Sequence, residues 1–367
     1  DSEAKVAAVR YRLEATGVEA PRIIGSVQPI SLHHGVVEGR YARRSCEDCH
    51  STSSTMARGI VLSSYRPTGA EIELVGDTNV ELDGERVMDE DGRLLFVPDP
   101  SASGRYVIGL ARAGWIDIIG LLMFAGVVVG TTVHGGLRWF EARKRPASEH
   151  HRYTRVKLYT GHERIWHLIQ AAAIVFLILT GLEMRDHLGL IGFEPSVRLH
   201  NALGFFLLFN AFLGLFYYVT SGAIRHYISE PREFGMIAMR QVGYYVSGIF
   251  KGAPHPVERS ARARLNPLQQ VTYVAILNVL LPWQILTGFA IWGIEYYPHL
   301  GEWFGGLPVL MPLHALGSWL FASFILMHVY LTTTSGRRPI SGIEAMVTGW
   351  EEMPEADDMS THEEKSA

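Results

Sequence analysis

The chain has 367 residues, of which 48% are hydrophobic, and its formal net charge at pH 7 is −4. No basic face alternates with aromatic residues, which argues against nucleic acid as a partner. Two cysteines in the whole chain exclude a disulfide framework of any size. The first ~110 residues are polar and turn-rich, and every long apolar segment follows them. We therefore expect a small soluble domain ahead of a membrane domain.

The soluble part contains one strong chemical motif and one structural pattern. Cys46-Glu47-Asp48-Cys49-His50 follows the Cys-x-x-Cys-His pattern of c-type haem attachment. A redox pair or half of a zinc site also uses Cys-x-x-Cys, but here the two cysteines of the chain form one complete motif. Residues 71–100 alternate apolar and polar side chains between turn-forming pairs, which predicts short β-hairpins.

We therefore predict one haem c, bound through thioethers to Cys46 and Cys49, with His50 as the proximal iron ligand. The sixth iron ligand is open, because histidine and methionine both serve in such sites. The candidates are His33, His34, Met56 and Met88, and we favour His33 or His34.

Five apolar segments follow, each near the length that a bilayer crossing needs. Pro282 predicts a kink in the fourth segment, and residues 232–250 form an amphipathic pattern typical of an interfacial helix. The final residues, 351–367, are acidic and are expected to be disordered. The five segments are 115–134, 165–184, 200–220, 271–294 and 311–333.

Lysine and arginine are concentrated in alternate loops. They follow the first, third and fifth segments, whereas the loops 186–199 and 296–310 hold only Arg198. Basic loops stay in the cytoplasm. We therefore expect a multi-pass protein of the bacterial inner membrane, with the N-terminal domain in the periplasm and the C-terminus in the cytoplasm.

Four histidines stand near the ends of the apolar segments. His314 and His328 are 14 residues apart on one helix, so their imidazoles leave the same face about 21 Å apart. By depth, His200 pairs with His314 on the periplasmic side, and His167 pairs with His328 on the cytoplasmic side. Each pair can clamp one haem b between two helices. The alternative is a set of hydrogen-bonded interfacial histidines.

Two glycines repeat the same spacing. Gly181 follows His167 by 14 residues, and Gly214 follows His200 by 14 residues. A porphyrin needs room against a helix backbone, and glycine provides that room. The alternative is ordinary packing of small residues between membrane helices.

At this point residues 158–335 resemble the di-haem cytochrome b subunit of formate dehydrogenase, thiosulfate reductase and hydrogenase complexes. The resemblance rests on the histidine spacing and on several short elements. The first core helix has Arg164-Ile-Trp-His167 and Thr180-Gly181, and Asn266-Pro-Leu-Gln269-Gln270 is similar to the family's Asn-x-x-Gln element. The chain departs from the four-helix form by its N-terminal haem c domain and its extra first helix.

The resemblance implies a quinone site near the His167/His328 haem, bordered by Asn266 and Gln269. His134, at the end of the first apolar segment, lines that site, relays protons or binds another haem, unless it only caps its helix. His162 is a weaker alternative ligand at that end.

These inferences define a mainly α fold with five transmembrane helices, of which the last four form the di-haem bundle. We expect five parts: a periplasmic c-haem domain (1–112), an extra helix (113–136), a basic loop (137–164), the cytochrome b domain (165–335) and an acidic cytoplasmic tail (336–367).

The expected function is electron transfer between the quinone pool and a periplasmic redox partner through one haem c and two haems b. No catalytic constellation is present, so we expect one subunit of a hetero-oligomeric oxidoreductase complex. The partner would be a multihaem cytochrome, a dehydrogenase or a hydrogenase. The alternatives are a membrane haem sensor and a proton- or ion-translocating protein that uses the same histidines.

Overall fold

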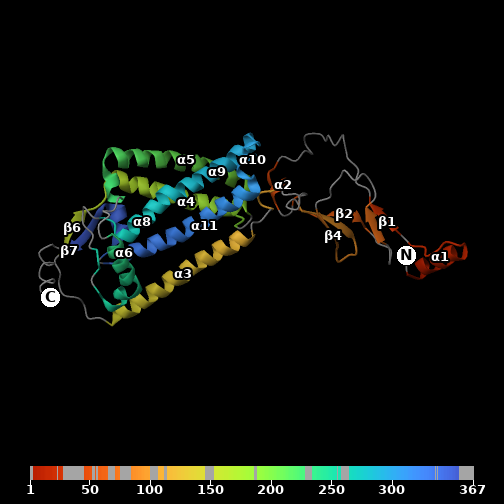
Figure 1. The fold of residues 1–367 in the computed structure, drawn as a ribbon, viewed down its shortest axis with the longest axis horizontal. Helices are drawn as coiled ribbons and strands as arrows, with labels where there is room; N and C mark the ends of the chain where they lie inside the picture. Colours follow the sequence, from red (N-terminus) through yellow and green to blue (C-terminus); the bar gives the residue numbers. More distant parts are fainter. Residues whose placement is uncertain are drawn as a thin grey trace. The chain divides into compact units, whose positions relative to one another are not determined.

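The computed structural model describes the following residues: 3–22, 24–27, 45–51, 54, 57–64, 71–74, 84–99, 106–110, 114–144, 153–185, 188–227, 234–253, 255–257, 264–334, 336 and 338–354. The chain forms two compact units. The first comprises residues 1–112 and 182–197, and the second comprises 113–181 and 198–367. Figure 1 labels the elements of both units.

The first unit contains short elements. They are α1 (Glu3–Ala15), β1 (Ile24–Val27), α2 (Glu47–His50), β2 (Ile60–Ser63), β3 (Glu71–Leu74), β4 (Gly84–Met88) and β5 (Leu94–Pro98). Strands β4 and β5 form an antiparallel hairpin, as predicted, and β2 pairs with the other edge of β5. The prediction is wrong for β3, which pairs in parallel with β1. A parallel pair joins distant segments, so local alternation does not reveal the partner.

The second unit contains five helices long and apolar enough to cross a membrane, and the protein is a multi-pass membrane protein. The spans are longer than predicted. Those at the ends of the series are α3 (Gly114–Arg143) and α11 (Leu307–Thr332). Between them are α4 (Gly161–Met184), α5 (Phe193–Thr220) and a composite span of α8 (Pro267–Ala275), η3 (Ile276–Leu280) and α9 (Leu281–Tyr296).

The composite span changes its helix type next to Pro282. Proline has no N–H, so the carbonyl of Asn278 loses its helical donor. The preceding residues form a π-helical turn, η3, and α9 then continues to Tyr296. The disturbance predicted at Pro282 therefore takes the form of a wider turn, a common device for bending a helix.

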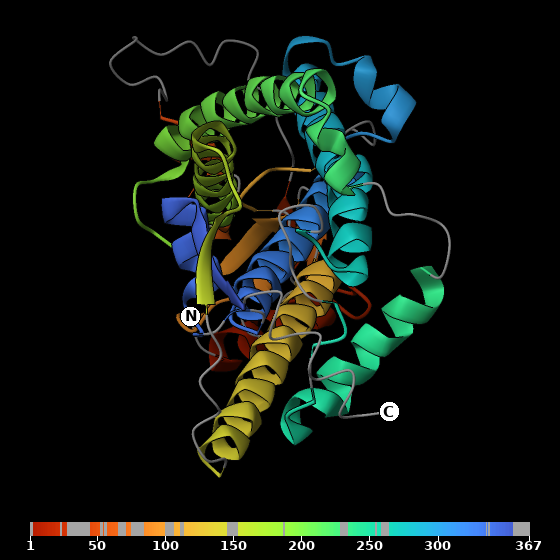
Figure 2. The same ribbon diagram turned by 90° about the vertical axis from the view of Figure 1, so that its left-hand side faces the viewer.

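Four spans share one core. Ala173 of α4, Leu207 of α5, Leu281 of α9 and Phe321 of α11 are buried against one another. Helix α3 packs beside α11 (Figure 2). At this contact Gly120 leaves room for the ring of Trp319.

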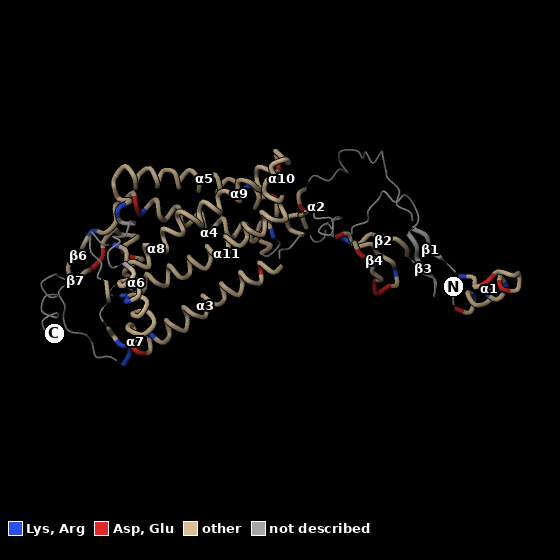
Figure 3. The backbone as a smooth tube through the Cα atoms, in the orientation of Figure 1, with Lys and Arg blue, Asp and Glu red and all other residues tan. Residues whose placement is uncertain are grey.

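The outer faces of the spans remain apolar and exposed, which suits contact with lipid. Figure 3 shows uncharged residues along most of each span and many of the lysines and arginines of this unit near the beginning of α4.

Short elements cover that end of the unit. Residues 234–251 are helical as predicted, in α6 (Phe234–Gly243), η2 (Tyr244–Gly248) and α7 (Ile249–Lys251). The remaining elements are η1 (Ala223–Tyr227), α10 (Leu300–Phe304), α12 (Ser341–Thr348), β6 (Tyr153–Lys157) and β7 (Trp350–Pro354).

Strand β7 corrects one prediction. It pairs antiparallel with β6, in the segment expected to be a loop. Disorder is therefore wrong for residues 351–354, because their backbone groups find partners in β6. The remaining tail, 355–367, lies outside the described residues.

Candidate metal centres

Two pairs of imidazoles meet inside the helical unit. The ring centroids of His200 and His314 are 6.2 Å apart, and those of His167 and His328 are 6.1 Å apart. Two imidazoles that share one metal ion through bonds of about 2 Å have centroids roughly 6 Å apart. The spacing within each pair therefore suits one iron, and these are the two pairs that the depth argument predicts.

Each ring of the His200/His314 centre contacts a threonine. The Nδ1 of His200 lies 2.9 Å from the Oγ1 of Thr180, which donates its own proton to the carbonyl of Phe176 at 2.8 Å. The Nδ1 of His314 lies 2.9 Å from the Oγ1 of Thr287, which donates to the carbonyl of Trp283. Each hydroxyl therefore accepts the Nδ1 proton, and each Nε2 keeps the lone pair that binds a metal.

A glycine follows each threonine and lets the imidazole approach the helix. A Cβ at Gly181 would lie 3.6 Å from the Cε1 of His200, and a Cβ at Gly288 would lie 3.0 Å from the Cε1 of His314. The amide of Gln284 also donates to the Nε2 of His314 at 3.2 Å. This bond agrees with a lone pair on Nε2, and the amide would have to turn away when a metal binds there.

The His167/His328 centre is less symmetric. The hydroxyl of Tyr273 lies 3.1 Å from the Nδ1 of His328, and Phe324 stacks on the same ring. The Nδ1 of His167 is buried and has no hydrogen-bond partner. His162 does not reach this pair, because its ring lies against Tyr217 at 4.1 Å.

Gly214 does not provide the space that we predicted for a porphyrin. A Cβ there would lie 2.5–2.6 Å from three ring atoms of Trp166. The indole N–H of Trp166 donates to the carbonyl of Asn210 at 2.9 Å. Gly214 therefore accommodates an indole, which is ordinary helix packing.

Neither centre has enough protein ligands for a bare metal ion. In the described part of the chain, no group of three or more His, Cys, Asp or Glu side chains gathers as a metal site would require. Two axial imidazoles and no further protein ligand are what a porphyrin-bound iron needs. The residues present therefore fit a haem at each pair.

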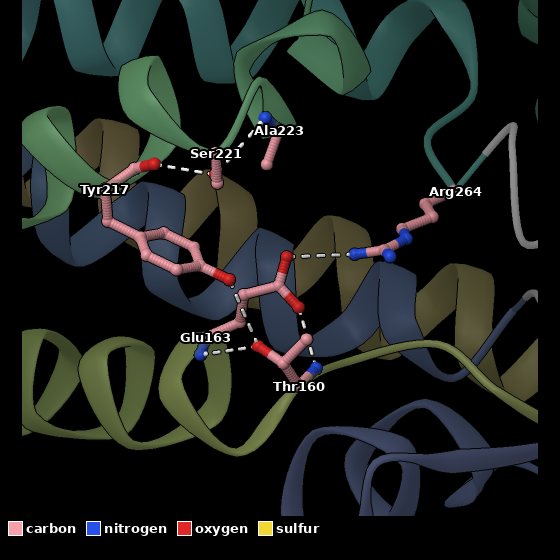
Figure 4. A network of polar contacts seen from close by, with 6 residues as sticks. All are labelled: Thr160, Glu163, Tyr217, Ser221, Ala223 and Arg264. Carbon is pink, nitrogen blue, oxygen red and sulfur yellow. Dashed lines mark hydrogen bonds and ion pairs between the residues drawn. The ribbon is translucent and has the colours of Figure 1, made fainter.

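A buried ion pair lies beside the His167/His328 centre (Figure 4). The Glu163 carboxylate accepts the Thr160 N–H at 2.7 Å, and the Thr160 hydroxyl accepts the Glu163 N–H at 3.2 Å, which forms a capping box for α4. Arg264 donates to the same carboxylate at 3.0 Å. Glu163 is one turn before His167, so this pair ties the segment before α8 to the helix that carries that ring.

The Asn266–Gln269 element forms a second capping box, at the start of α8. Asn266 Oδ1 accepts the Gln269 N–H at 2.9 Å, and Gln269 Oε1 accepts the Asn266 N–H at 3.0 Å. The remaining side-chain donor of Asn266 reaches the hydroxyl of Tyr245 at 3.3 Å. Structural capping therefore uses most of the hydrogen-bonding capacity that we had assigned to quinone binding.

His134 bridges three elements rather than capping α3. Its Nε2 donates to the backbone carbonyl of Tyr245 at 2.8 Å, and its Nδ1 accepts from the hydroxyl of Tyr330. Both ring nitrogens are thus engaged, and another haem would have to displace one of them. His134 and Asn266 meet at the same residue, Tyr245.

The Cys-x-x-Cys-His motif lies in the first unit. Helix α2 is a single turn in which His50 N–H donates to the carbonyl of Cys46 at 2.9 Å. This turn brings Cys46 and Cys49 to one face, and neither forms a disulfide. The His50 Nδ1 donates to the carbonyl of Ile108 at 2.8 Å. His50 Nε2 is therefore left for a metal, and the turn fits a haem c.

The described residues leave the sixth ligand undecided. Met88 ends β4 and is 41% exposed. The other candidates, His33, His34 and Met56, lie outside the described residues.

Paired imidazoles in an apolar helical bundle define a membrane b-type cytochrome that works in electron transfer. The model of the family "Prokaryotic cytochrome b561" matches residues 158–349, and the chain belongs to this family. This agrees with the resemblance drawn from the histidines.

Two relatives support the assignment. The chain is 31% identical over 242 residues to "Putative cytochrome YdhU" of Escherichia coli (strain K12), covering 64% of this chain and 88% of the relative. It is 27% identical over 221 residues to "Probable Ni/Fe-hydrogenase B-type cytochrome subunit" of Cupriavidus necator, covering 53% and 85%. No solved structure matches the chain significantly.

Sequence reasoning missed four residues of these sites. Thr287 and Gly288 had a detectable signal, because Ile-Leu-Thr-Gly occurs at both 178–181 and 285–288. Tyr245 and Tyr330 had none, because single tyrosines near segment ends are commonly interfacial anchors.

Proposed function

We propose that this protein is the electron-transfer subunit of a quinone-linked oxidoreductase complex in the bacterial inner membrane. One haem c, held by Cys46, Cys49 and His50, and two haems b, held by the two imidazole pairs, connect the quinone pool with a periplasmic redox partner. The haems supply the one-electron chemistry when bound. The direction of electron flow is left open.

The observation that carries the proposal is the arrangement of two imidazole pairs along one bundle. Helix α11 supplies a ring to each pair, 14 residues apart. Phe321 lies seven residues from both His314 and His328, and it is 4% exposed within the core of the bundle. This apolar layer keeps water from the space between the centres, where a charge would be poorly solvated.

The quinone site is proposed at the end of the bundle where α4 begins. His134, Tyr330 and Asn266 bring polar groups together around Tyr245. A tyrosine hydroxyl and an amide can donate to quinone carbonyls, while His134 and Tyr330 form a bonded pair through which a proton can pass. Gln269 contributes by holding the loop through the capping box.

The partner is proposed to be a catalytic subunit or a multihaem cytochrome in the periplasm. One relative is named as the cytochrome subunit of a Ni/Fe-hydrogenase. The basic loops place the motif domain on the opposite side from the cytoplasm. The haem c domain is proposed to meet the partner there.

The experiment that tests the proposal is a haem count on the purified protein. Reduced-minus-oxidised absorbance and the pyridine haemochrome assay should give one covalent haem c and two extractable haems b per chain. A fully loaded, folded preparation without haem b would refute the bundle assignment. His200→Ala and His314→Ala should lose the same haem b, and loss of different haems would refute the pairing.

Asn266→Ala tests the quinone part. We expect slower quinol oxidation with all haems retained, measured as haem reduction by a water-soluble quinol. The matched control is Asn278→Ala, because Asn278 donates only to the carbonyl of Val274 in its own helix. Equal rates in both variants would remove Asn266 from the quinone site.

A further inference from the structure

The haem c motif rests on the start of α5, within the first unit. The ring of His50 stacks on the ring of Phe193, with centroids 4.5 Å apart and planes 6° apart. Phe193 is the first residue of α5. The only side chain that could reach the iron as a proximal ligand in this motif is therefore packed against a residue of a membrane-spanning helix.

A carboxylate of the motif makes a second contact with the same turn. Glu47 Oε1 accepts the backbone N–H of Phe193 at 3.1 Å and that of Glu194 at 3.4 Å. The first N–H groups of a helix have no partner within it, and a carboxylate there is stabilised by the helix dipole. Hydrogen bonds, first from Ser45 and then from the backbone, lower the pKa of the Glu47 carboxyl, so it stays ionised near neutral pH.

The loop before Phe193 is itself held in place. The carboxylate of Glu183 accepts the N–H groups of Leu190, Ile191 and Gly192 at 2.8–2.9 Å. Gly192 has φ +86°, and a Cβ there would lie 3.2 Å from the Glu47 carboxylate. Glycine at this residue therefore permits both the turn and the approach of Glu47.

Helix α5 then carries the same face to a candidate haem b ligand. His200 follows Phe193 by seven residues in one continuous helix. Seven residues are nearly two turns, so both side chains leave the same face about 10 Å apart along the axis.

We propose that Phe193 and Glu47 are positioning residues that hold the His50 imidazole on α5. The first two turns of α5 then form the route for one-electron exchange between the haem c site and the His200/His314 centre. One iron loses the electron and the other gains it, and no bond or proton changes. The inference rests on the proposed function and adds a residue-level path to it. Packed atoms matter here because tunnelling slows steeply across gaps.

The test uses the full-length protein with its haems. Phe193→Leu removes the stacked ring, and Phe193→Tyr retains it. Phe212→Leu is the matched control, because Phe212 is on the same helix and is 63% exposed. A photoreductant reduces haem c, and the transfer to haem b is followed at their separate absorbance bands. Electron paramagnetic resonance of oxidised haem c reports the orientation of its imidazole ligand.

We expect Phe193→Leu to retain all haems, to shift the haem c resonance and to slow the exchange at least tenfold. Phe193→Tyr and Phe212→Leu should match the parent protein. An unchanged resonance and rate in Phe193→Leu would overturn the inference while leaving the proposed function intact. Absence of haem c, or of any exchange, in the parent protein would instead refute the proposed function.

Glu47→Gln provides a second, milder test that does not need the haem. It weakens the acceptor for the Phe193 and Glu194 amides without removing the ring. We expect faster hydrogen–deuterium exchange in residues 188–197 of the full chain, compared with Glu90→Gln on an exposed turn. Equal exchange in the two variants would overturn the docking by Glu47, including in a preparation where Phe193→Leu does not fold.

Discussion

Removing the hydroxyl of Thr180 or Thr287 should weaken haem binding at the His200/His314 centre. Each hydroxyl accepts the Nδ1 proton of one imidazole at 2.9 Å. Valine has a similar shape and cannot accept that proton. An orphaned buried donor costs about 1–3 kcal/mol, and loss of such an outer partner typically lowers metal affinity about 10–100-fold.

The expected result for either single Thr→Val variant has two parts. One haem b should be lost more readily, by one to two orders of magnitude in affinity. Its midpoint potential should also rise, because a hydrogen bond from Nδ1–H makes the imidazole a stronger donor to the oxidised iron. The assay is haem retention during dilution, followed by a redox titration of the haem b absorbance.

The matched control is Thr131→Val. Thr131 is also buried in a span, but its hydroxyl donates only to the carbonyls of Val127 and Val128. We expect normal haem content and potentials for this control. If Thr180→Val and Thr287→Val also behave as the parent protein does, the threonines do not orient the ligands and the reasoning fails.

Two further predictions concern packing and charge around the centres. Gly288→Val should expel the haem of the His200/His314 centre, because its Cβ would lie 3.0 Å from the His314 ring, whereas Gly126→Val on α3 has open space and should keep both haems b. A normal haem count in Gly288→Val would contradict this. Glu163→Gln should lower the free energy of unfolding by about 3 kcal/mol, because it leaves Arg264 without its buried partner. In Glu141→Gln, which breaks an exposed pair with Lys144, the loss should stay below about 1 kcal/mol. Thermal unfolding in detergent measures both, and equal shifts would refute a special role for the buried pair.

Local chemistry explains what was predictable from the sequence. A bilayer-length apolar segment needs no distant partner to be recognised, so all five spans were found. A histidine in such a segment is costly unless it has a function, and the spacing of His314 and His328 on one helix gives their common face directly. The resemblance to cytochrome b subunits rested on the same residues and agrees with the family match.

Residues whose role depends on a distant partner were harder to assign. Gly214 had the spacing of a porphyrin contact, yet Trp166 from α4 fills the space beside it. Asn266 and Gln269 were assigned to a quinone site, yet most of their bonds cap α8. The acidic residues 351–354 looked disordered, yet β6 supplies their backbone partners.

The sequence by itself determined the ligand types, the number of spans and the family, because these follow from residue chemistry and short-range spacing. The tertiary structure decided which groups hold each imidazole. Thr180 and Thr287 serve as acceptors only because α4 packs against α5 and α9 packs against α11 at the right depth. Phe193 reaches His50 only because residues far apart in the chain fold into one unit. Helix packing sets such pairings through the shapes of both surfaces, and a single segment carries only one of them.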